Sequence, residues 1–293
     1  MSAPGATLGL KQTIAPGALL GLLGGGQLGR MFAAAALRMG YRVAMLDPDK
    51  HAPAAQMCAR HICAAYDDEA ALAELARDCA AVTTEFENPP ADALAWLAQR
   101  LPVRPSPSAV GIAQDRSKEK SFLAQNDVPI APFAVVRGVA DLSALPAPFQ
   151  FPALLKTSRF GYDGKGQARV DSLTQAQAVF AQWGNVECVL EQLMPLQREL
   201  SVVLARGVDG ATACFPVAEN AHRNGILDVT IAPARVSAAL QQRAQQLALT
   251  IAQRLDYVGV LAVEMFVLAD ETLLVNELAP RPHNSGHYSI DAC

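Results

Sequence analysis

The sequence predicts an α/β chain in two parts, an open parallel sheet of the doubly wound type followed by a strand-rich α+β part. Strand-like apolar runs alternate with helical runs over about the first hundred residues, which is typical of parallel sheets. Beyond them, short turns such as RGVDG and LADE join the strand-like runs, which is typical of antiparallel pairing.

The composition gives no sign of a nucleic-acid or membrane surface. The chain has 293 residues, a formal net charge of −4 and 51% hydrophobic residues. This length suffices for one large or two ordinary domains, and the charge is not that of a basic surface. The 6 cysteines contain no C-x-x-C pair, and no apolar run approaches the roughly 18 residues of a membrane span. We therefore expect reduced thiols and a cytoplasmic location.

In the first part, we expect a regular order of elements. Residues 1–17 lack periodicity and predict a flexible leader. The proline-rich segment 102–110 predicts the exit from this part. Apolar periodicity predicts strands from Ala18 and at 41–46, 62–64 and 81–84, and helices at 27–39, 69–79 and 90–99.

In the second part, the runs of strand character are longer. We expect two long strands at 199–207 and 212–220, and a strand–turn–strand unit at 261–278. Helices are expected near 116–125, at 173–183 and at 236–255. Residues 287–293 predict the beginning of a further helix, so we expect this part to be incomplete at its C-terminal end.

A glycine-rich turn follows the first strand. In LLGGGQLGRM, Gly24, Gly26 and Gly29 have the G-x-G-x-x-G spacing of a dinucleotide-binding turn, and Asp47 closes the next apolar run. Free N–H groups at the start of the following helix favour an anion. The turn therefore predicts phosphate binding, to NAD or to another phosphate, while a tight turn that needs glycine only for packing remains an alternative.

A second glycine-rich segment follows Lys156, which ends an apolar strand. Residues 161–167, GYDGKGQ, combine three glycines with an aspartate and a lysine. Backbone donors beside a fixed ammonium group suit a polyphosphate. The segment is not a Walker loop, and a solvated hairpin turn would use the same residue types.

Two glutamates in the last strand pair form the strongest predicted site. A turn centred between Asp270 and Glu271 would place Glu264 opposite Glu277, with Cβ atoms roughly 5 Å apart. Like charges in this position are destabilising unless a cation lies between them, and two carboxylates with phosphates would hold a hard cation. Exposure of one glutamate, or a register shift of one residue, is the alternative. Asn276 would then point to the opposite face.

The loop after this strand pair is rich in hydrogen-bond donors. Its residues Arg281, His283, Asn284, Ser285 and His287 predict a clamp for a substrate. Zinc at the two histidines is disfavoured, because the neighbouring proline and glycine oppose the helix that their spacing requires.

The segment TTEFEN lies at the carboxyl end of a predicted parallel strand, where open α/β sheets keep ligands. Glu85 and Glu87 would point to the same side, although a polar loop without a function fits equally well. We expect His51 and His61 to be ordinary surface or sheet-edge residues.

The motifs and their order resemble the ATP-grasp family, and within it the 5-(carboxyamino)imidazole ribonucleotide synthetases. The resemblance rests on GGGQLGRM, TEFENPP, the Lys156 strand with FGYDGKGQ, EQLM, and VEMF…VNELAPRPHNSGH. It implies a Rossmann-like pre-ATP-grasp domain at 18–112 and an ATP-grasp domain at 113–293. The second domain would have a small lobe at about 113–192 and a large lobe at about 193–293.

The resemblance also implies a nucleotide and metal site. Arg116 and Lys156 would contact the ATP phosphates, a flap would cover them, and Glu264 and Glu277 would bind one or two Mg²⁺ ions, for which Mn²⁺ can substitute. The remaining nucleotide-binding residues would be Gly161, Tyr162, Asp163, Gly164, Lys165, Gly166 and Gln167 in the flap, Glu191, Gln192, Leu193 and Met194 at the adenine edge, Glu199 at the ribose, and His222 and Asn276 nearby.

The substrate implied by the resemblance is 5-aminoimidazole ribonucleotide. It would be surrounded by Gly26, Gln27, Leu28, Glu85, Tyr162, Arg281, His283, Asn284 and Ser285. Residues with a catalytic role would be Lys156, Tyr162, Asp163 and Arg281.

The implied reaction is ATP-dependent carboxylation of that ribonucleotide in purine biosynthesis, with bicarbonate activated as carboxyphosphate. Neither biotin nor NAD is expected, and neither is a nucleic-acid or membrane partner. A homodimer is expected. Another ATP-grasp carboxylate–amine ligase, a nucleotide-binding fragment without turnover, and a dehydrogenase remain alternative hypotheses.

Overall fold

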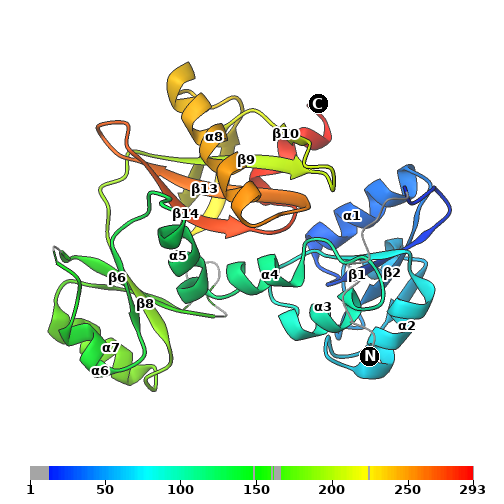
Figure 1. Ribbon diagram of the computed structural model, residues 1–293, viewed down its shortest axis with the longest axis horizontal. Coiled ribbons are helices and arrows are strands. Elements are labelled where there is room, and N and C mark those ends of the chain that lie inside the picture. The colour runs from blue at the N-terminus through cyan, green and yellow to red at the C-terminus, as the bar shows by residue number, and fades with distance from the viewer. Residues whose placement is uncertain (1–12, 148, 160, 162–165, 224, 293) are drawn as a thin grey trace, which may run out of the picture.

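The computed structural model describes residues 13–147, 149–159, 161, 166–223 and 225–292. Over these ranges the chain forms one sheet of six strands and two of four (Figure 1). No helix within the described ranges is long and apolar enough to cross a membrane.

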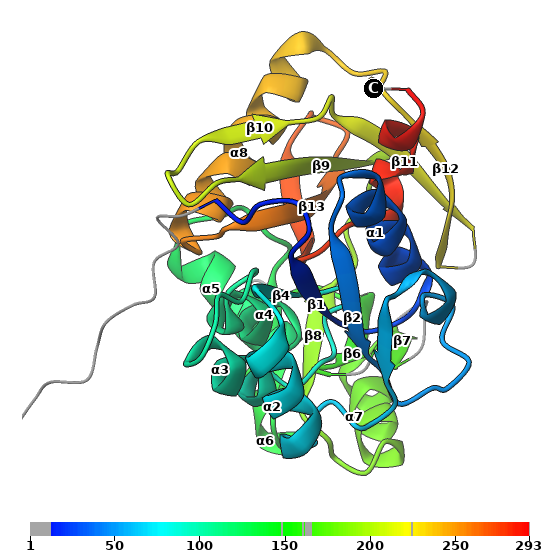
Figure 2. The same ribbon diagram turned by 90° about the vertical axis from the view of Figure 1, so that its right-hand side faces the viewer.

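The N-terminal sheet is parallel throughout, as predicted, with strand order β3-β2-β1-β4. Apolar side chains on both sheet faces are covered by helices, α1 on one face and α2 and α3 on the other (Figure 2). The elements are β1 (Leu19–Leu23), α1 (Gln27–Arg38), β2 (Arg42–Leu46), η1 (Ala55–Met57), β3 (Arg60–Ile62), α2 (Glu69–Asp78), β4 (Ala81–Thr84) and α3 (Ala91–Ala98). Strand β3 begins two residues before the segment predicted for it, and His61 lies on it at the sheet edge, as expected.

Two short helices connect this sheet to the rest of the chain. The second half of the predicted exit segment 102–110 is helical, because α4 (Pro107–Ala113) begins there. Its N-cap Ser106 accepts a hydrogen bond from the Ala109 N–H, and proline at the first helical position costs no hydrogen bond. Helix α5 (Arg116–Gln125) has the predicted bounds and is capped by Asp115.

The next sheet is antiparallel, with strand order β5-β8-β6-β7, and two helices pack on it. Phe180 is fully buried in the core between this sheet and its helices. The elements are β5 (Phe133–Val136), α6 (Val139–Ser143), β6 (Ala153–Thr157), β7 (Gln167–Val170), α7 (Leu173–Gln182) and β8 (Cys188–Gln192). We call this unit the small lobe.

The six-stranded sheet is also antiparallel, with β12-β11-β9-β13-β14 as its main order and β10 paired to β9. The elements are β9 (Arg198–Arg206), β10 (Thr212–Cys214), β11 (Ala218–Arg223), β12 (Ile226–Ile231), α8 (Ala238–Arg254), β13 (Gly259–Val267), β14 (Leu273–Ala279) and η2 (Asn284–Ile290). We call this unit the large lobe. The antiparallel character predicted for the second part is confirmed.

Three details of the large lobe differ from expectation. The strand predicted at 212–220 is interrupted between Cys214 and Ala218, where Pro216 has no N–H to pair. Strand β12 was not predicted. The helix predicted to begin at 287–293 is a 3₁₀ helix that begins at Asn284.

Helix α5 contributes to the core of the large lobe rather than only to the small lobe. Leu123 on α5 and Val128 just after it are buried in the same cluster as Leu261, Val263 and Val275 of β13 and β14. Since α5 also contacts β8 of the small lobe, it lies between the two lobes (Figure 1).

The glycine turn between β1 and α1 is occupied by carboxylates of the protein itself. The Gly25 N–H donates to Asp47 Oδ2 over 2.7 Å. The Gly26 and Gly29 N–H groups donate to the two carboxylate oxygens of Glu85, over 2.9 and 2.8 Å. These amides start helix α1, where its dipole favours a negative charge.

This arrangement gives no support to a dinucleotide at the glycine turn. The Asp47 carboxylate, which a dinucleotide would need for its ribose, also accepts bonds from the Tyr66 hydroxyl and the Asp49 N–H. A phosphate at the Gly26 and Gly29 amides would have to displace Glu85. In this structure the glycines serve the close approach of protein side chains, and the dehydrogenase hypothesis loses its basis.

We predict that Gly24→Ala destabilises the protein by about 3 kcal/mol, since a strained backbone and overpacking each cost about 1–3 kcal/mol. Gly24 has φ +98°, and an added Cβ would lie 2.5 Å from Glu85 Cγ and 2.7 Å from Phe86. The matched control is Gly138→Ala, whose Cβ would meet nothing within 4 Å. Thermal unfolding of both variants tests this, and equal melting temperatures would contradict it.

Candidate functional site

The hairpin of β13 and β14 brings two carboxylates together. Glu264 pairs with Glu277 across the strands, as predicted. Near the turn, however, Val267 pairs with Leu273. If this register continued along both strands, Glu264 would lie opposite Asn276. A bulge shifts the register by one residue and makes Asn276 the extra residue. The predicted pairing is therefore confirmed, although the register near the turn differs by one residue from the one that suggested it.

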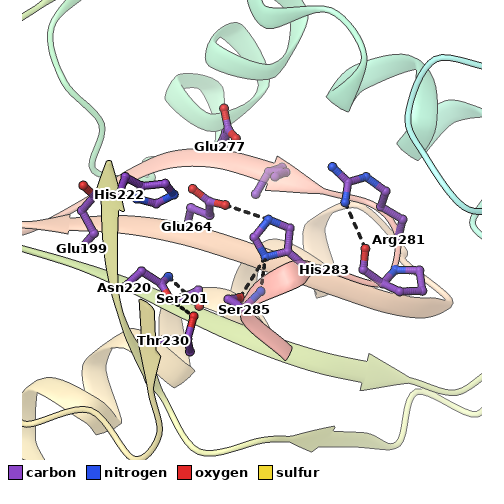
Figure 3. Close-up of polar contacts among 12 residues, drawn as sticks. Glu199, Ser201, Asn220, His222, Thr230, Glu264, Glu277, Arg281, His283 and Ser285 are labelled. Atoms are coloured by element: carbon purple, nitrogen blue, oxygen red, sulfur yellow. Dashed lines mark hydrogen bonds and ion pairs between the residues drawn. The ribbon is translucent and has the colours of Figure 1, made fainter. Parts of the chain in front are cut away.

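The two carboxylates have polar partners that approach from different directions. Glu264 Oε1 lies 2.8 Å from His283 Nε2 (Figure 3), and Glu277 Oε2 lies 3.4 Å from Arg116 Nη1. Burial alone would raise the pKa of Glu277, but the positive charges of Arg116 and Lys156 outweigh it and hold the pKa below its usual value. Like-charge repulsion between the glutamates is thus relieved from two sides.

His283 is held in one orientation by the residue two positions after it. The Ser285 N–H donates to His283 Nδ1 over 3.3 Å, and the Ser285 hydroxyl lies 2.8 Å from the same nitrogen. Since Nδ1 accepts, the proton of the neutral ring is on Nε2, which donates to Glu264. Ser285 is fully buried, so in this structure it positions His283 rather than facing a ligand as expected.

A buried cationic cluster lies beside the hairpin. Lys120 Nζ and Lys156 Nζ each lie 3.2 Å from Glu191 Oε2. Burial would raise the pKa of Glu191, but the two ammonium groups lower it to about 2. Burial lowers the pKa of Lys156, an effect that Glu191 partly offsets. Glu191 Oε1 is buried without a hydrogen-bond partner.

A second buried acid is on the same helix as Lys120. Burial raises the pKa of Glu119 to about 8, against the opposing charges of Lys120 and Arg116. Glu119 Oε1 accepts a 2.6 Å bond from the Leu278 N–H of β14.

On the other side of the hairpin lie two residues that were expected to bind the nucleotide. Here their side chains contact each other. Glu199 Oε2 lies 2.5 Å from His222 Nδ1, and both side chains are about one quarter exposed (Figure 3). Behind them Asn220 donates from Nδ2 to the Ser201 hydroxyl and accepts from the Thr230 hydroxyl, both over 3.0 Å. This chain of bonds joins β9, β11 and β12 below the site.

A cavity of about 410 Å³ lies among these groups, between the two lobes and the N-terminal unit. Of the residues predicted for the site, those lining it are Arg116, Lys156, Gly161, Gly166, Gln167, Glu199, His222, Glu264, Asn276, Glu277, Arg281, His283 and Asn284. Residues from all parts of the chain after α3 therefore meet at one place.

Other predicted residues do not line this cavity. They are Gly26, Gln27, Leu28, Glu85, Glu191, Gln192, Leu193, Met194 and Ser285. Gln27 is exposed at the start of α1, and the Leu193 N–H already donates to Pro152 O. Tyr162, Asp163, Gly164 and Lys165 lie outside the described residues.

Glu87, which the sequence analysis named beside Glu85 without a definite role, belongs to the site, and so do several residues that it did not name. Glu87 pairs with Arg281 and joins the N-terminal unit to the loop after β14. Leu196 and Phe266 add apolar surface to the cavity. Glu119 and Lys120 lie behind the hairpin, and no local pattern marks them, because a charged pair in a helix has the same spacing whether buried or exposed.

The donor set around the hairpin suits a hard cation whose remaining ligands come from another molecule. Among the described residues, no three His, Cys, Asp or Glu side chains form a group that could hold a metal. Two carboxylates face each other, and Asn276 Oδ1 next to them is buried without a hydrogen-bond partner. An orphaned buried oxygen at this place indicates a missing partner.

Comparison with protein families gives two matches that together span most of the chain. Residues 18–114 match a ribonucleotide synthetase preATP-grasp domain, and residues 121–293 match an ATP-grasp domain. The N5-carboxyaminoimidazole ribonucleotide synthase of Bacillus subtilis is 44% identical over 97% of this chain and 74% of its own length. The chain belongs to this family of ATP-grasp proteins.

Further members are similar in sequence and in structure. The protein of the same name from Brucella melitensis is 46% identical over 97% of this chain and 79% of its own length. A solved synthetase in complex with ADP aligns with a TM-score of 0.92 and 43% identity over 97% of this chain and 75% of that one. The Aspergillus clavatus enzyme, in complex with ADP and 5-aminoimidazole ribonucleotide, aligns with a TM-score of 0.85 and 31% identity over 94% of this chain and 72% of that one.

One prediction for this ATP-grasp site concerns the pair of His222 and Glu199. The hydrogen bond that His222 donates to Glu199 raises the pKa of His222 above its usual value, against burial, which lowers it. A raised histidine pKa contributes stability that is fully present below about pH 6.5 and is lost as the pH rises through the folded-state value.

We therefore expect His222→Gln to lower the melting temperature by about 2 °C at pH 6, equivalent to about 1 kcal/mol, and by less at pH 9. Thermal unfolding across this range, without ligands, measures the difference. A loss that stays constant or grows with pH would contradict the assignment.

Proposed function

We propose that this protein carboxylates 5-aminoimidazole ribonucleotide to 5-(carboxyamino)imidazole ribonucleotide in purine biosynthesis, using ATP and bicarbonate. The observation that carries the proposal is the cavity where Glu264 and Glu277 face each other beside Lys156 and Arg116. The chain that has this arrangement matches relatives named as this synthase, and the match covers most of their length.

ATP would lie in this cavity with its phosphates near Lys156 and Arg116. These cations come from β6 and α5, and they provide the charge that a polyphosphate needs. Glu199 would bind the ribose hydroxyls, and His222 would then leave its present contact with that carboxylate. At the adenine edge, residues 191–194 would contact the base. A solved relative in complex with ADP supports the choice of an adenine nucleotide as ligand.

One or two Mg²⁺ ions, replaceable by Mn²⁺, would be held by Glu264 and Glu277. The residues fit such an ion, since both are hard oxygen donors and Asn276 Oδ1 lies beside them without a partner. Bound there, the ion would neutralise charge on the phosphates. The chain's own residues would orient the nucleotide and keep the two carboxylates in place.

The acceptor would lie between the loop after β14 and the N-terminal unit. Arg281, His283 and Asn284 line the cavity next to Glu264. Gly26, Gln27, Leu28 and Glu85 would approach from the other side, and Ser285 would hold His283. A relative in complex with ADP and 5-aminoimidazole ribonucleotide supports this acceptor.

In the first step, a bicarbonate oxygen attacks the γ-phosphorus and ADP leaves, giving carboxyphosphate. The exocyclic amine of the ribonucleotide then attacks the carboxyl carbon, or CO₂ released from carboxyphosphate, and phosphate leaves as the nitrogen loses its proton. Lys156 and Arg281 would stabilise the charges that develop. Tyr162, Asp163 and the rest of the flap at 161–167 would exclude water from the intermediate.

The same proposal includes domain boundaries at 18–112 and 113–293, a homodimer, and a cytoplasmic location. Only the resemblance to the family supports the last two. No role for biotin, NAD or nucleic acid forms part of it.

We predict that ADP release requires bicarbonate and increases on addition of 5-aminoimidazole ribonucleotide. Glu277→Gln should lower this rate at least about a hundredfold, because a charge that stabilises the phosphoryl group is lost. The matched control is Glu271→Gln, an exposed glutamate in the turn of the same hairpin, which should keep the wild-type rate. A coupled assay for ADP measures both.

The outcomes separate the alternatives. Bicarbonate-dependent turnover that ignores the ribonucleotide would indicate a ligase with another acceptor. Nucleotide binding by calorimetry without ADP release would indicate a binding fragment. Full activity in Glu277→Gln would remove this residue from the metal site.

A further inference from the structure

The outer edge of β14 is tied to the segment that begins with α5. Strand β14 is at the end of the large sheet, so the groups on one side of its backbone have no strand to pair with. The Val275 N–H donates to Pro129 O over 2.7 Å. Next along the strand, Lys120 Nζ donates to Asn276 O over 2.9 Å, and the Leu278 N–H donates to Glu119 Oε1 over 2.6 Å. These bonds flank Glu277 on both sides.

The location of these bonds coincides with the bulge. A bulge leaves its extra residue without a partner on the neighbouring strand, so β13 alone does not fix the backbone of Asn276. Lys120 and Glu119 hold the backbone on either side of Glu277, and thereby hold the register in which Glu277 faces Glu264. Among the described residues, no other side chain bonds to the Asn276 carbonyl or to the Leu278 N–H.

Lys120 makes a second contact that reaches the small lobe. Its Nζ lies 3.2 Å from Glu191 Oε2, an oxygen shared with Lys156 Nζ. Lys120 is 1% exposed. A buried ammonium group is unfavourable unless it is paired and hydrogen-bonded, and this one joins the bulge in the large lobe to a carboxylate on β8.

We propose that Lys120 and Glu119 are positioning residues that hold the bulge carrying Asn276 and Glu277, and so set the geometry in which a divalent cation binds. The inference rests on the proposed function, which places that cation at Glu264 and Glu277. Neither residue is one of the proposed metal ligands, although Glu119 also lines the cavity. Both act through the backbone of β14, as partners behind a metal ligand commonly do.

The test is binding of Mn²⁺ in the presence of ADP, followed by electron paramagnetic resonance of the free ion. Lys120→Met should weaken Mn²⁺ binding at least about tenfold, the lower end of what loss of such a partner costs. Lys118→Met is the matched control, since Lys118 is exposed on the same helix, and it should bind Mn²⁺ as the wild type does. A merely structural lysine would reduce the folded fraction and leave the affinity of that fraction unchanged.

A second pair of variants decides the matter if Lys120→Met does not fold. Glu119→Gln keeps an oxygen that can accept the bond from the Leu278 N–H, whereas Glu119→Met removes it. We expect wild-type Mn²⁺ affinity in the first and about tenfold weaker binding in the second. Equal affinities in that pair would overturn the inference.

The remaining outcomes are also distinct. Mn²⁺ affinity within twofold of the wild type in a folded Lys120→Met variant would overturn the positioning role, while the proposed metal site stands. If the wild-type protein binds no Mn²⁺, or if Glu277→Gln leaves its Mn²⁺ binding unchanged, the metal site itself is overturned. The positioning role is then overturned with it.

Discussion

Two glutamates that face each other across neighbouring strands impose the main constraint on this structure. Glu264 and Glu277 are opposed on β13 and β14, and their repulsion must be balanced locally. His283 approaches from the loop after the hairpin and Arg116 from helix α5. The elements that surround the hairpin are thus arranged around a pair of negative charges.

The cavity brings groups of both charges close together. Glu199, Glu264 and Glu277 line it from the large lobe, and Arg116 and Lys156 line it from α5 and β6. A nucleotide polyphosphate with a divalent cation has the complementary pattern, since the phosphates need cations and the metal needs oxygen donors. The protein's own ion pairs hold these groups in place until such a ligand replaces them.

Most of the fold could be predicted from the sequence, because it follows from local periodicity. The parallel sheet, the antiparallel second part and the bounds of α5 came from apolar spacing and turn residues alone. The facing glutamates were also predicted. The register of the strands near the turn differs by one residue from the assumed one, and the bulge at Asn276 restores the predicted pairing of the glutamates. A bulge leaves no reliable mark in a single sequence, so its role became visible only in three dimensions.

What the sequence could not show are contacts between distant positions. The glycine turn has the spacing of a phosphate-binding turn, yet Glu85, 56 residues beyond Gly29, takes the amides that predicted an anion. Likewise, nothing local distinguishes the buried Lys120 from the exposed Lys118 on the same helix. The local sequence pattern predicted which backbone amides and charged side chains could form contacts. Tertiary packing determined which partners they contact.

The central claim is that the cavity between the lobes transfers the γ-phosphoryl group of ATP to bicarbonate. The most direct measurement uses bicarbonate labelled with ¹⁸O, with ATP and 5-aminoimidazole ribonucleotide, and follows the label by mass spectrometry of the inorganic phosphate. Formation of carboxyphosphate predicts that one ¹⁸O atom appears in the phosphate for each ADP released. Phosphate free of the label, at an unchanged rate of ADP release, would show that water is the acceptor and would contradict the account.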